Sequence, residues 1–120
     1  MLLPMPAAAA PQIPHRFYGD VTVAGVAAAS GLTITATISG ATFPYAPSVR
    51  TASGSYGSGS ILFKVPADDP DTSTKEGGVD GDTVNFFVNG IAAGSATFIV
   101  GGSTELDLSI VSLGAAATGG

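Results

Sequence analysis

The stretch that decides the predicted fold is GDTVNFFVNGIAAGSATFIVGGSTELDLSIVS, residues 81–112. Apolar and polar residues alternate in three runs within it, at residues 83–89, 95–100 and 105–111. Side chains two apart in a strand share one face, so each run predicts a half-buried strand. Asn89-Gly90 and Gly101-Gly102 separate the runs and are typical of tight turns, because both residue types tolerate a positive φ. The stretch predicts three antiparallel strands joined by two tight turns.

The remainder of the chain continues this pattern in shorter pieces. Strands are expected over residues 15–24, 32–39 and 61–65, with a short edge strand within residues 40–59 and a flexible loop around Tyr56 at residues 53–60. No segment carries an apolar stripe at helical spacing, and Gly and Pro interrupt the Ala runs. The sequence predicts an all-β, antiparallel sandwich of six to seven strands, about the size of an immunoglobulin domain.

Composition excludes several classes of function. The 120 residues carry a net charge of −5, and the only fixed cations are Arg16, Arg50, Lys64 and Lys75. A nucleic-acid partner or an anionic membrane surface would need a basic patch, which four cations cannot build. Cys is absent, which excludes disulfides and thiolate metal sites. No run reaches the roughly 20 apolar residues that a spanning helix needs, so membrane insertion is not expected.

The first 14 residues form a separate apolar segment. Pro4, Pro6, Pro11 and Pro14 exclude a helix interior and favour an extended backbone. An ordered extended tail of this kind is expected to dock on a sheet edge, either of its own domain or of a neighbour. If extended, it places alternate apolar side chains on one side: Leu3, Met5, Ala7 and Ala9.

The predicted organisation is an N-terminal donor segment, a sandwich domain and a small-residue tail, at residues 1–14, 15–112 and 113–120. Residues 8–10 are all Ala and resemble the small-residue end of a signal peptide. We therefore expect an exported, extracellular or cell-surface chain whose leader has been removed or lies upstream of this numbering.

Several short motifs resemble a known family. They are PHRFYG at residues 14–19, VTV at 21–23, GSYG at 54–57, GDTVNF at 81–86 and VNG at 88–90. Over residues 14–111 the chain resembles the prealbumin-like or immunoglobulin-like β-sandwich modules of bacterial and archaeal surface proteins. The resemblance implies a fold much more firmly than any activity. With its apolar N-terminal tail, the arrangement resembles subunits of extracellular filaments in which such a strand completes the next subunit.

The sequence offers no catalytic constellation. His15 is the single histidine, and it lies between the proline-rich tail and the start of a strand. Nucleophilic catalysis would need a nucleophile and an orienting carboxylate beside it. We therefore expect His15 to have a hinge or surface hydrogen-bonding role, and the protein not to be an enzyme.

The acidic loop at residues 68–82 is the best candidate for a metal site. Its calcium candidates are Asp69, Asp71, Asp80 and Asp82, with further oxygens from Asp68 and Glu76. The spacing does not match a helix–loop–helix calcium site, so a solvated acidic loop is the competing interpretation. Paired carboxylates for glycoside hydrolysis would need the rigid walls of a cleft, which a single loop does not provide. No cofactor is expected.

The aromatic residues give a second binding hypothesis. A sugar-stacking face could be built from Tyr18, Tyr45, Tyr56 and Phe87, although Trp, which such faces often use, is absent. Packing between strands or subunits is the competing interpretation for these residues.

These observations lead to one main expectation about function. The chain is expected to be a structural, pilus-like subunit that polymerises into a helical filament when its N-terminal strand adds to the next copy. The predicted donor residues are Leu3, Met5, Ala7 and Ala9, and the predicted acceptor groove is Val84, Phe86, Phe98, Leu106 and Leu108. The alternative is a monomeric cell-surface module that binds carbohydrate or calcium.

Overall fold

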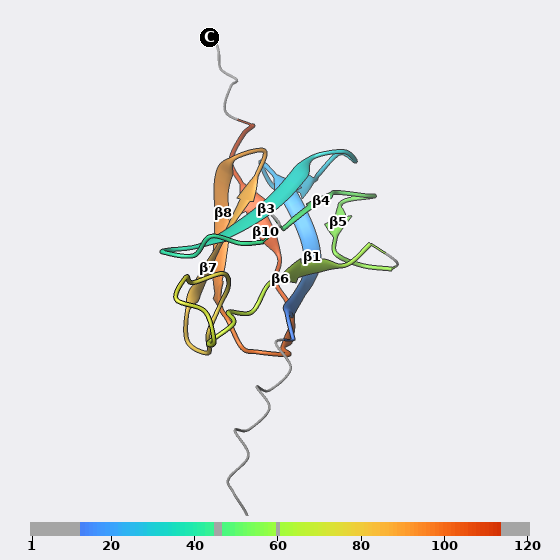
Figure 1. Ribbon diagram of the computed structural model, residues 1–120. Helices are drawn as coiled ribbons and strands as arrows, with labels where there is room; N and C mark the ends of the chain where they lie inside the picture. The colour runs from blue at the N-terminus through green and yellow to red at the C-terminus, as the bar shows by residue number, and fades with distance from the viewer. Residues whose placement is uncertain (1–12, 45–46, 60, 114–120) are drawn as a thin grey trace, which may run out of the picture.

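The computed structural model describes residues 13–44, 47–59 and 61–113, which form two β-sheets and no helix (Figure 1). The all-β prediction is confirmed for these residues. Ten short strands are present instead of six to seven: β1 His15–Val23, β2 Val26–Ala27, β3 Thr33–Ile38, β4 Ser48–Arg50, β5 Ser55–Tyr56, β6 Phe63–Val65, β7 Thr83–Val88, β8 Ile91–Thr97, β9 Ser103–Glu105 and β10 Leu108–Ile110. The higher number arises because one long strand pairs with several very short ones.

The four-stranded sheet has the order β4-β3-β7-β8 and is antiparallel throughout. Its central strands are β3 and β7, and β7 forms a hairpin with the edge strand β8 through Asn89 and Gly90, at φ 47° and 82°. Both values lie in the left-handed region, as a tight hairpin turn of this kind requires. A register irregularity between Phe86 and Phe87 bends the pair. The predicted strand at residues 83–89, its Asn89-Gly90 turn and the predicted edge strand, here β4, are confirmed. The second strand of the hairpin spans Ile91–Thr97 and not the predicted residues 95–100.

The second sheet is built on β1, the longest strand. Along one edge, β1 pairs in succession with β6, β5 and β2, all antiparallel to it. Along its other edge it pairs with β9 and then β10, both parallel to it. Gly19 lies where these two partners meet, and a Cβ at this position would be 2.5 Å from the carbonyl oxygen of Leu106. The absence of a side chain at Gly19 therefore permits the close approach of the β9–β10 connection.

The expectation that residues 105–111 extend the first hairpin is wrong. β8 ends at Thr97, and the chain then crosses to the other sheet, where the amide N–H of Arg16 donates to the carbonyl oxygen of Gly102 at 2.9 Å. The amide N–H of Leu106 likewise donates to Tyr18. The same alternation suits pairing with β1 or with β8, so the sequence pattern alone does not choose between these partners.

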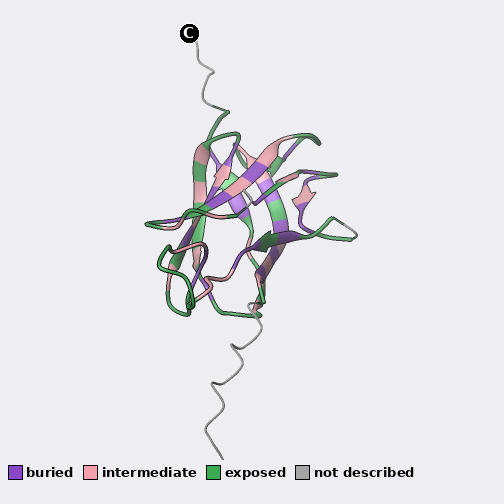
Figure 2. Cartoon of the chain, in the orientation of Figure 1, coloured by how far each residue is buried: buried purple, intermediate pink, exposed green. Residues whose placement is uncertain are grey.

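The core lies between the two sheets, as the purple bands on their facing strands show (Figure 2). Alternate residues are buried along β1, β3 and β7, which matches the predicted period of two. The residues of the core that are buried completely, with no exposed area, are Phe17, Val21, Ile34, Phe63, Val65, Val84, Phe86, Val88 and Phe98. Aromatic rings meet at the centre, where Phe17 and Phe86 pack edge to face with centroids 4.8 Å apart.

The predicted flexible loop around Tyr56 packs on β1 over its described residues, 53–59. Ser55 and Tyr56 pair with β1, and the Tyr56 ring is buried, with its hydroxyl donating to the carbonyl oxygen of Leu106 at 2.7 Å. Gly57 explains why the loop can lie so close to β1, because a Cβ there would overlap the carbonyl oxygen of Phe17. A glycine-rich run in this chain therefore marks close backbone packing.

Candidate functional site

The exposed apolar side chains concentrate at the two ends of β1. Around its first residue lie Ile13, Val79, Ile99 and Val100, which we call the start pole. Around its last residue lie Val26, Val111 and Leu113, which we call the end pole. Ile61 and Leu62, which precede β6, are the other large exposed apolar residues of the described chain apart from these two groups. The nine residues of β1 separate the poles by roughly 30 Å.

The start pole holds the point where the N-terminal segment joins the fold. The carbonyl oxygen of Ile13 accepts a hydrogen bond from the amide N–H of Gly101 at 3.0 Å. Two residues later, His15 is fully buried and stacks on Phe17 with ring centroids 3.9 Å apart. These contacts fix the chain from Ile13 onward to the loop at residues 98–102.

His15 is held by two hydrogen bonds that define its tautomer. Its Nδ1 accepts from the amide N–H of Ile99 at 3.0 Å, so Nδ1 carries no proton. The proton therefore lies on Nε2, which donates to the hydroxyl oxygen of Thr104 at 2.8 Å. Burial lowers the pKa of His15, because a charged imidazolium would lose its hydration. The expected hydrogen-bonding role is present, but the expected surface position is wrong.

The end pole contains a groove between the two sheets, with a volume of about 500 Å³. It opens between β8 and β10, which are edge strands of their sheets. Its lining comes from the end of β1 and its turn, the start of β8 and the end of β10: Thr22, Ala24, Gly25, Ile91, Ala92, Ser109, Ile110 and Val111. Val111 at its rim is 89% exposed, the highest value among the large apolar residues described.

The groove closes toward the middle of the strands. A Cβ at Gly94 would lie 3.3 Å from Cδ2 of Leu108, so β8 and β10 pack closely at that level. The opening is therefore confined to the end pole. Among the described residues of β8, Ile91 and Ala92 line the space, and the small side chain of Ala92 leaves room in it.

Of the five residues predicted to line an acceptor groove, four lie in the interior and the fifth packs against it. Val84, Phe86 and Phe98 have no exposed area, Leu108 is 1% exposed, and Leu106 is half-buried. The first four belong to the core between the sheets. The predicted donor residues Leu3, Met5, Ala7 and Ala9, like Tyr45, lie outside the described residues.

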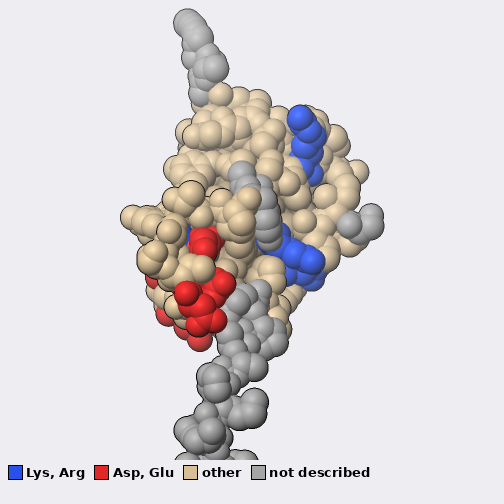
Figure 3. Space-filling model, in the orientation of Figure 1, with Lys and Arg blue, Asp and Glu red and all other residues tan. Residues whose placement is uncertain are grey.

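The acidic side chains visible in Figure 3 gather at the lower left of the molecule, near the loop between β6 and β7. Several of them accept hydrogen bonds from backbone amides of this chain: Asp69 from Asp71, Asp80 from Val100 and Asp82 from Val79. Asp82 also pairs with Lys75 at 2.7 Å, and this hydrogen bond is the main reason that its pKa is lowered. Within residues 13–44, 47–59 and 61–113, no three potential ligands gather into a metal site. The geometry of the described loop therefore gives the calcium prediction no support.

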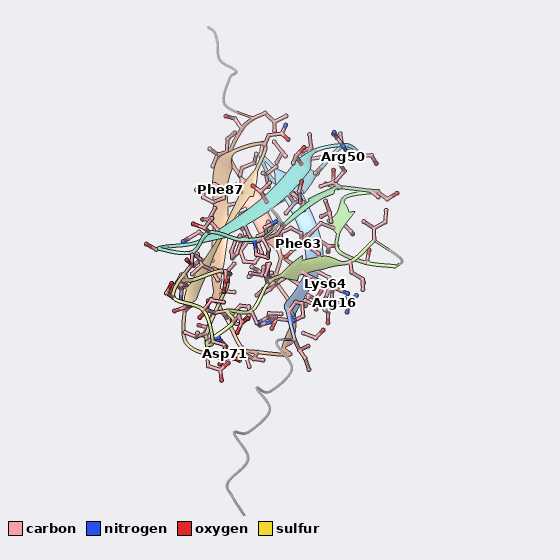
Figure 4. The ribbon with its side chains drawn as sticks, in the orientation of Figure 1. Arg16, Arg50, Phe63, Lys64, Asp71 and Phe87 are labelled. Atoms are coloured by element: carbon pink, nitrogen blue, oxygen red, sulfur yellow. The ribbon has the colours of Figure 1, made fainter. Side chains whose placement is uncertain are left out.

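The predicted aromatic face is divided among three surroundings. Tyr56 is buried in the interior, and burial raises its pKa strongly. Tyr18 is half-buried beneath the Arg16 guanidinium, 4.6 Å from the ring centroid. Phe87 belongs to the other sheet, away from Arg16 and Lys64 (Figure 4). These three rings therefore do not form one stacking surface.

The chain has no match among models of protein families, curated proteins or solved structures. The resemblance to prealbumin-like surface modules therefore stays a prediction from the sequence. No helix in the described part of the chain has the length and apolar character needed to cross a membrane.

Sequence reasoning missed the groove at the end pole. The signal available was the run of small residues after the Asn89-Gly90 turn, which a strand packed on both faces would not carry. That run points to a groove only if β10 lies beside β8. β10 reaches this position because the chain crosses to the other sheet after β8.

Proposed function

We propose that the protein is a structural subunit of an extracellular filament, in which the N-terminal strand of one copy adds to the next copy. In this proposal the two-sheet fold is an immunoglobulin-like, prealbumin-like sandwich module of a prokaryotic surface protein. The observation that carries the proposal is the position of the exposed apolar residues, at opposite ends of β1, with the N-terminal segment joining at one of them.

The arrangement favours head-to-tail contact. A contact between the start pole of one copy and the end pole of another uses two different surfaces, so the joined pair retains one free start pole and one free end pole. Such a heterologous contact continues into a chain of subunits unless a rotation closes it into a ring. The contact would remove apolar residues of both surfaces from water, and this removal is favourable in proportion to the apolar area buried.

Strand addition supplies the specificity that apolar contact alone lacks. Main-chain hydrogen bonds along a sheet edge give affinity, and alternate side chains fix the register. Residues 1–12 are long enough, at roughly 40 Å when extended, to reach well into a neighbouring subunit. Pro4 and Pro6 lack an N–H donor, so they fit positions of an edge pairing where no donor is needed.

Removing residues 1–12 tests the proposal. We expect the shortened chain to remain monomeric under conditions in which the full chain forms fibres, as judged by light scattering and electron microscopy. The matched control removes residues 114–120 and should leave fibre formation intact. Fibres formed equally well by the chain lacking residues 1–12 would show that strand donation is wrong.

A further inference from the structure

We propose that the groove between β8 and β10 at the end pole is the acceptor site, and that its occupant is the N-terminal segment, residues 1–12, of a second copy of this chain. This inference rests on the proposed function and deepens it, because it assigns the edge and the end of the fold that receive the strand.

The first argument is the state of the two edges. β8 hydrogen-bonds to β7 and ends the four-stranded sheet, while β10 hydrogen-bonds to β1 and ends its path in the other sheet. Among the described residues the two edge strands lie next to each other, yet no pairing joins them. An added strand in this opening would therefore meet the unpaired edge of β8, of β10 or of both.

The second argument is the size and chemistry of the space. Ile91, Ala92, Ile110 and Val111 give it apolar walls, and its volume of about 500 Å³ suits a few side chains. None of the described residues that line it is charged. Alternate apolar side chains of an extended segment, such as Leu3 and Met5, have the chemistry to fill it.

The third argument is direction. The N-terminal segment joins the fold at Ile13, on the start pole, whereas the groove opens at the end pole. The way between β8 and β10 from the start pole to the groove is closed at Gly94 and Leu108, where the two strands already pack closely. A strand from a second copy placed beyond the end pole enters the open end directly.

The fourth argument concerns the competing occupant within the chain. Residues 114–120, GAAATGG, follow Leu113 and so begin near the same pole. They carry no side chain larger than Thr and would bury little apolar area in the groove. Residues 1–12 include Leu2, Leu3 and Met5, which supply that area.

Cysteine cross-linking of the full chain tests the assignment, since the native sequence contains no Cys. The test variant is Leu3→Cys with Val111→Cys, because Val111 lies at the groove and is highly exposed. The control is Leu3→Cys with Ser48→Cys, because Ser48 is exposed on β4, the opposite edge of the four-stranded sheet. After mild oxidation we expect a ladder of covalent multimers from the Val111 variant and at least tenfold fewer from the Ser48 variant.

The other outcomes distinguish failure of the groove assignment from failure of strand donation itself. Fibres that cross-link through Ser48 and not through Val111 would keep strand donation and overturn the groove as its site. Fibres with neither link would also overturn the groove, and would favour another occupant such as residues 114–120. A single Leu3–Val111 link within one chain, in a protein that stays monomeric, would overturn both the groove assignment and the proposed function. Dimers from Val111→Cys alone would indicate a symmetric contact and contradict the head-to-tail arrangement.

A second test, which needs no cysteine, places a large side chain in the groove and, as a control, the same side chain outside it. Ala92 and Thr97 are both exposed on β8, but only Ala92 lines the groove. Ala92→Arg should reduce the assembled fraction at least tenfold, while Thr97→Arg should leave it unchanged, with equal unfolding midpoints for the two variants. Fibre formation by Ala92→Arg at the level of the unchanged chain would contradict the assignment.

Discussion

His15 shows how one buried side chain ties the start pole together. It follows Ile13 by two residues, stacks on Phe17 and accepts a hydrogen bond from the backbone of the loop at Ile99. Protonation of Nδ1 would place an N–H against the Ile99 N–H and would put a charge in a buried position. The neutral ring is therefore part of the folded structure.

Stability should therefore fall as the pH drops below the ordinary value for histidine. The pKa of His15 is lowered in the folded state, so the unfolded chain binds more protons once the pH falls below about 6.5. The free energy of unfolding should decrease from there until the pH passes the folded-state pKa. Circular dichroism of denaturant unfolding at several pH values measures this decrease.

The control is His15→Gln, which removes the only histidine of the chain. The variant should be less stable at pH 7 but should show a flat stability between about pH 7 and 5.5, since histidine is the side chain whose ordinary pKa, about 6.5, lies in that range. An equal pH dependence in the two proteins would show that His15 is not the titrating group.

Gly57 and Gly59 permit a comparison at matched backbone conformation. Both have a positive φ, 72° and 67°, but only Gly57 has neighbours where a Cβ would stand. Gly59→Ala should cost about 1–2 kcal/mol from the left-handed conformation alone. Gly57→Ala should cost about 1–3 kcal/mol more, because its Cβ would overlap the backbone of β1.

Denaturant unfolding of the two glycine variants measures the difference. Equal losses would mean that the loop at residues 53–59 does not pack on β1 as described. The Tyr56 hydroxyl bond to Leu106 would then also be in doubt, because it depends on the same approach.

At the level of the strands, the hairpin of β7 and β8 is the part that the sequence predicted best. Asn89-Gly90 sets the turn locally, and the alternation of Val84, Phe86 and Val88 sets the buried face. Both signals are contained within a few residues. A local rule therefore sufficed to predict β7 and its turn.

Asn89 acts in two ways that substitutions can separate. It adopts a positive φ, and its side-chain oxygen accepts from the amide of Thr33 at 2.8 Å. Asn89→Gly keeps the conformation and loses the hydrogen bond, which should lower the free energy of unfolding by about 0.5–1.5 kcal/mol. Asn89→Ala loses both and should cost about 1–2 kcal/mol more. If the two variants proved equally stable, the left-handed turn would not be the source of the effect.

The partners of β1 could not be predicted in the same way. β9 and β10 show an alternation that suits pairing with β8 as well as with β1, and their true partner lies about 90 residues away in the sequence, as the register of Arg16 with Ser103 shows. Gly19 within β1 was a usable signal, since an interior strand glycine often marks a close backbone approach. The glycine indicates where another segment approaches β1 but does not indicate which segment it is.

The candidate site depends on this unpredicted crossing. β10 reaches the side of β8 only because the chain leaves the first sheet after Thr97. The small residues of β8 therefore indicate the opening only once β10 is known to lie beside them. The predicted donor segment, in contrast, was visible in the sequence as an apolar run with four prolines, although its role stays a proposal.

Taken as one body, the molecule presents apolar surface at both ends of β1 and carries its acidic loop near the start pole (Figure 3). This polarity suits end-to-end contact between identical subunits. With few charges over the rest of the surface, apolar contacts and strand pairing would dominate the association.

The start pole should therefore tolerate a charge in the monomer but not in the fibre. Ile99 and Ile61 are 52% and 58% exposed, and only Ile99 belongs to a pole. Ile99→Asp should lower the assembled fraction about tenfold or more, whereas Ile61→Asp should assemble as the unchanged chain does, as measured by sedimentation. Equal assembly by both variants would mean that the start pole makes no contact between subunits.

Electron cryomicroscopy of the full chain under assembling conditions is the most direct measurement. We expect fibres in which density for residues 1–12 of each subunit runs between β8 and β10 of the next one. Discrete particles in which those residues lie against the body of their own chain would contradict strand donation between copies.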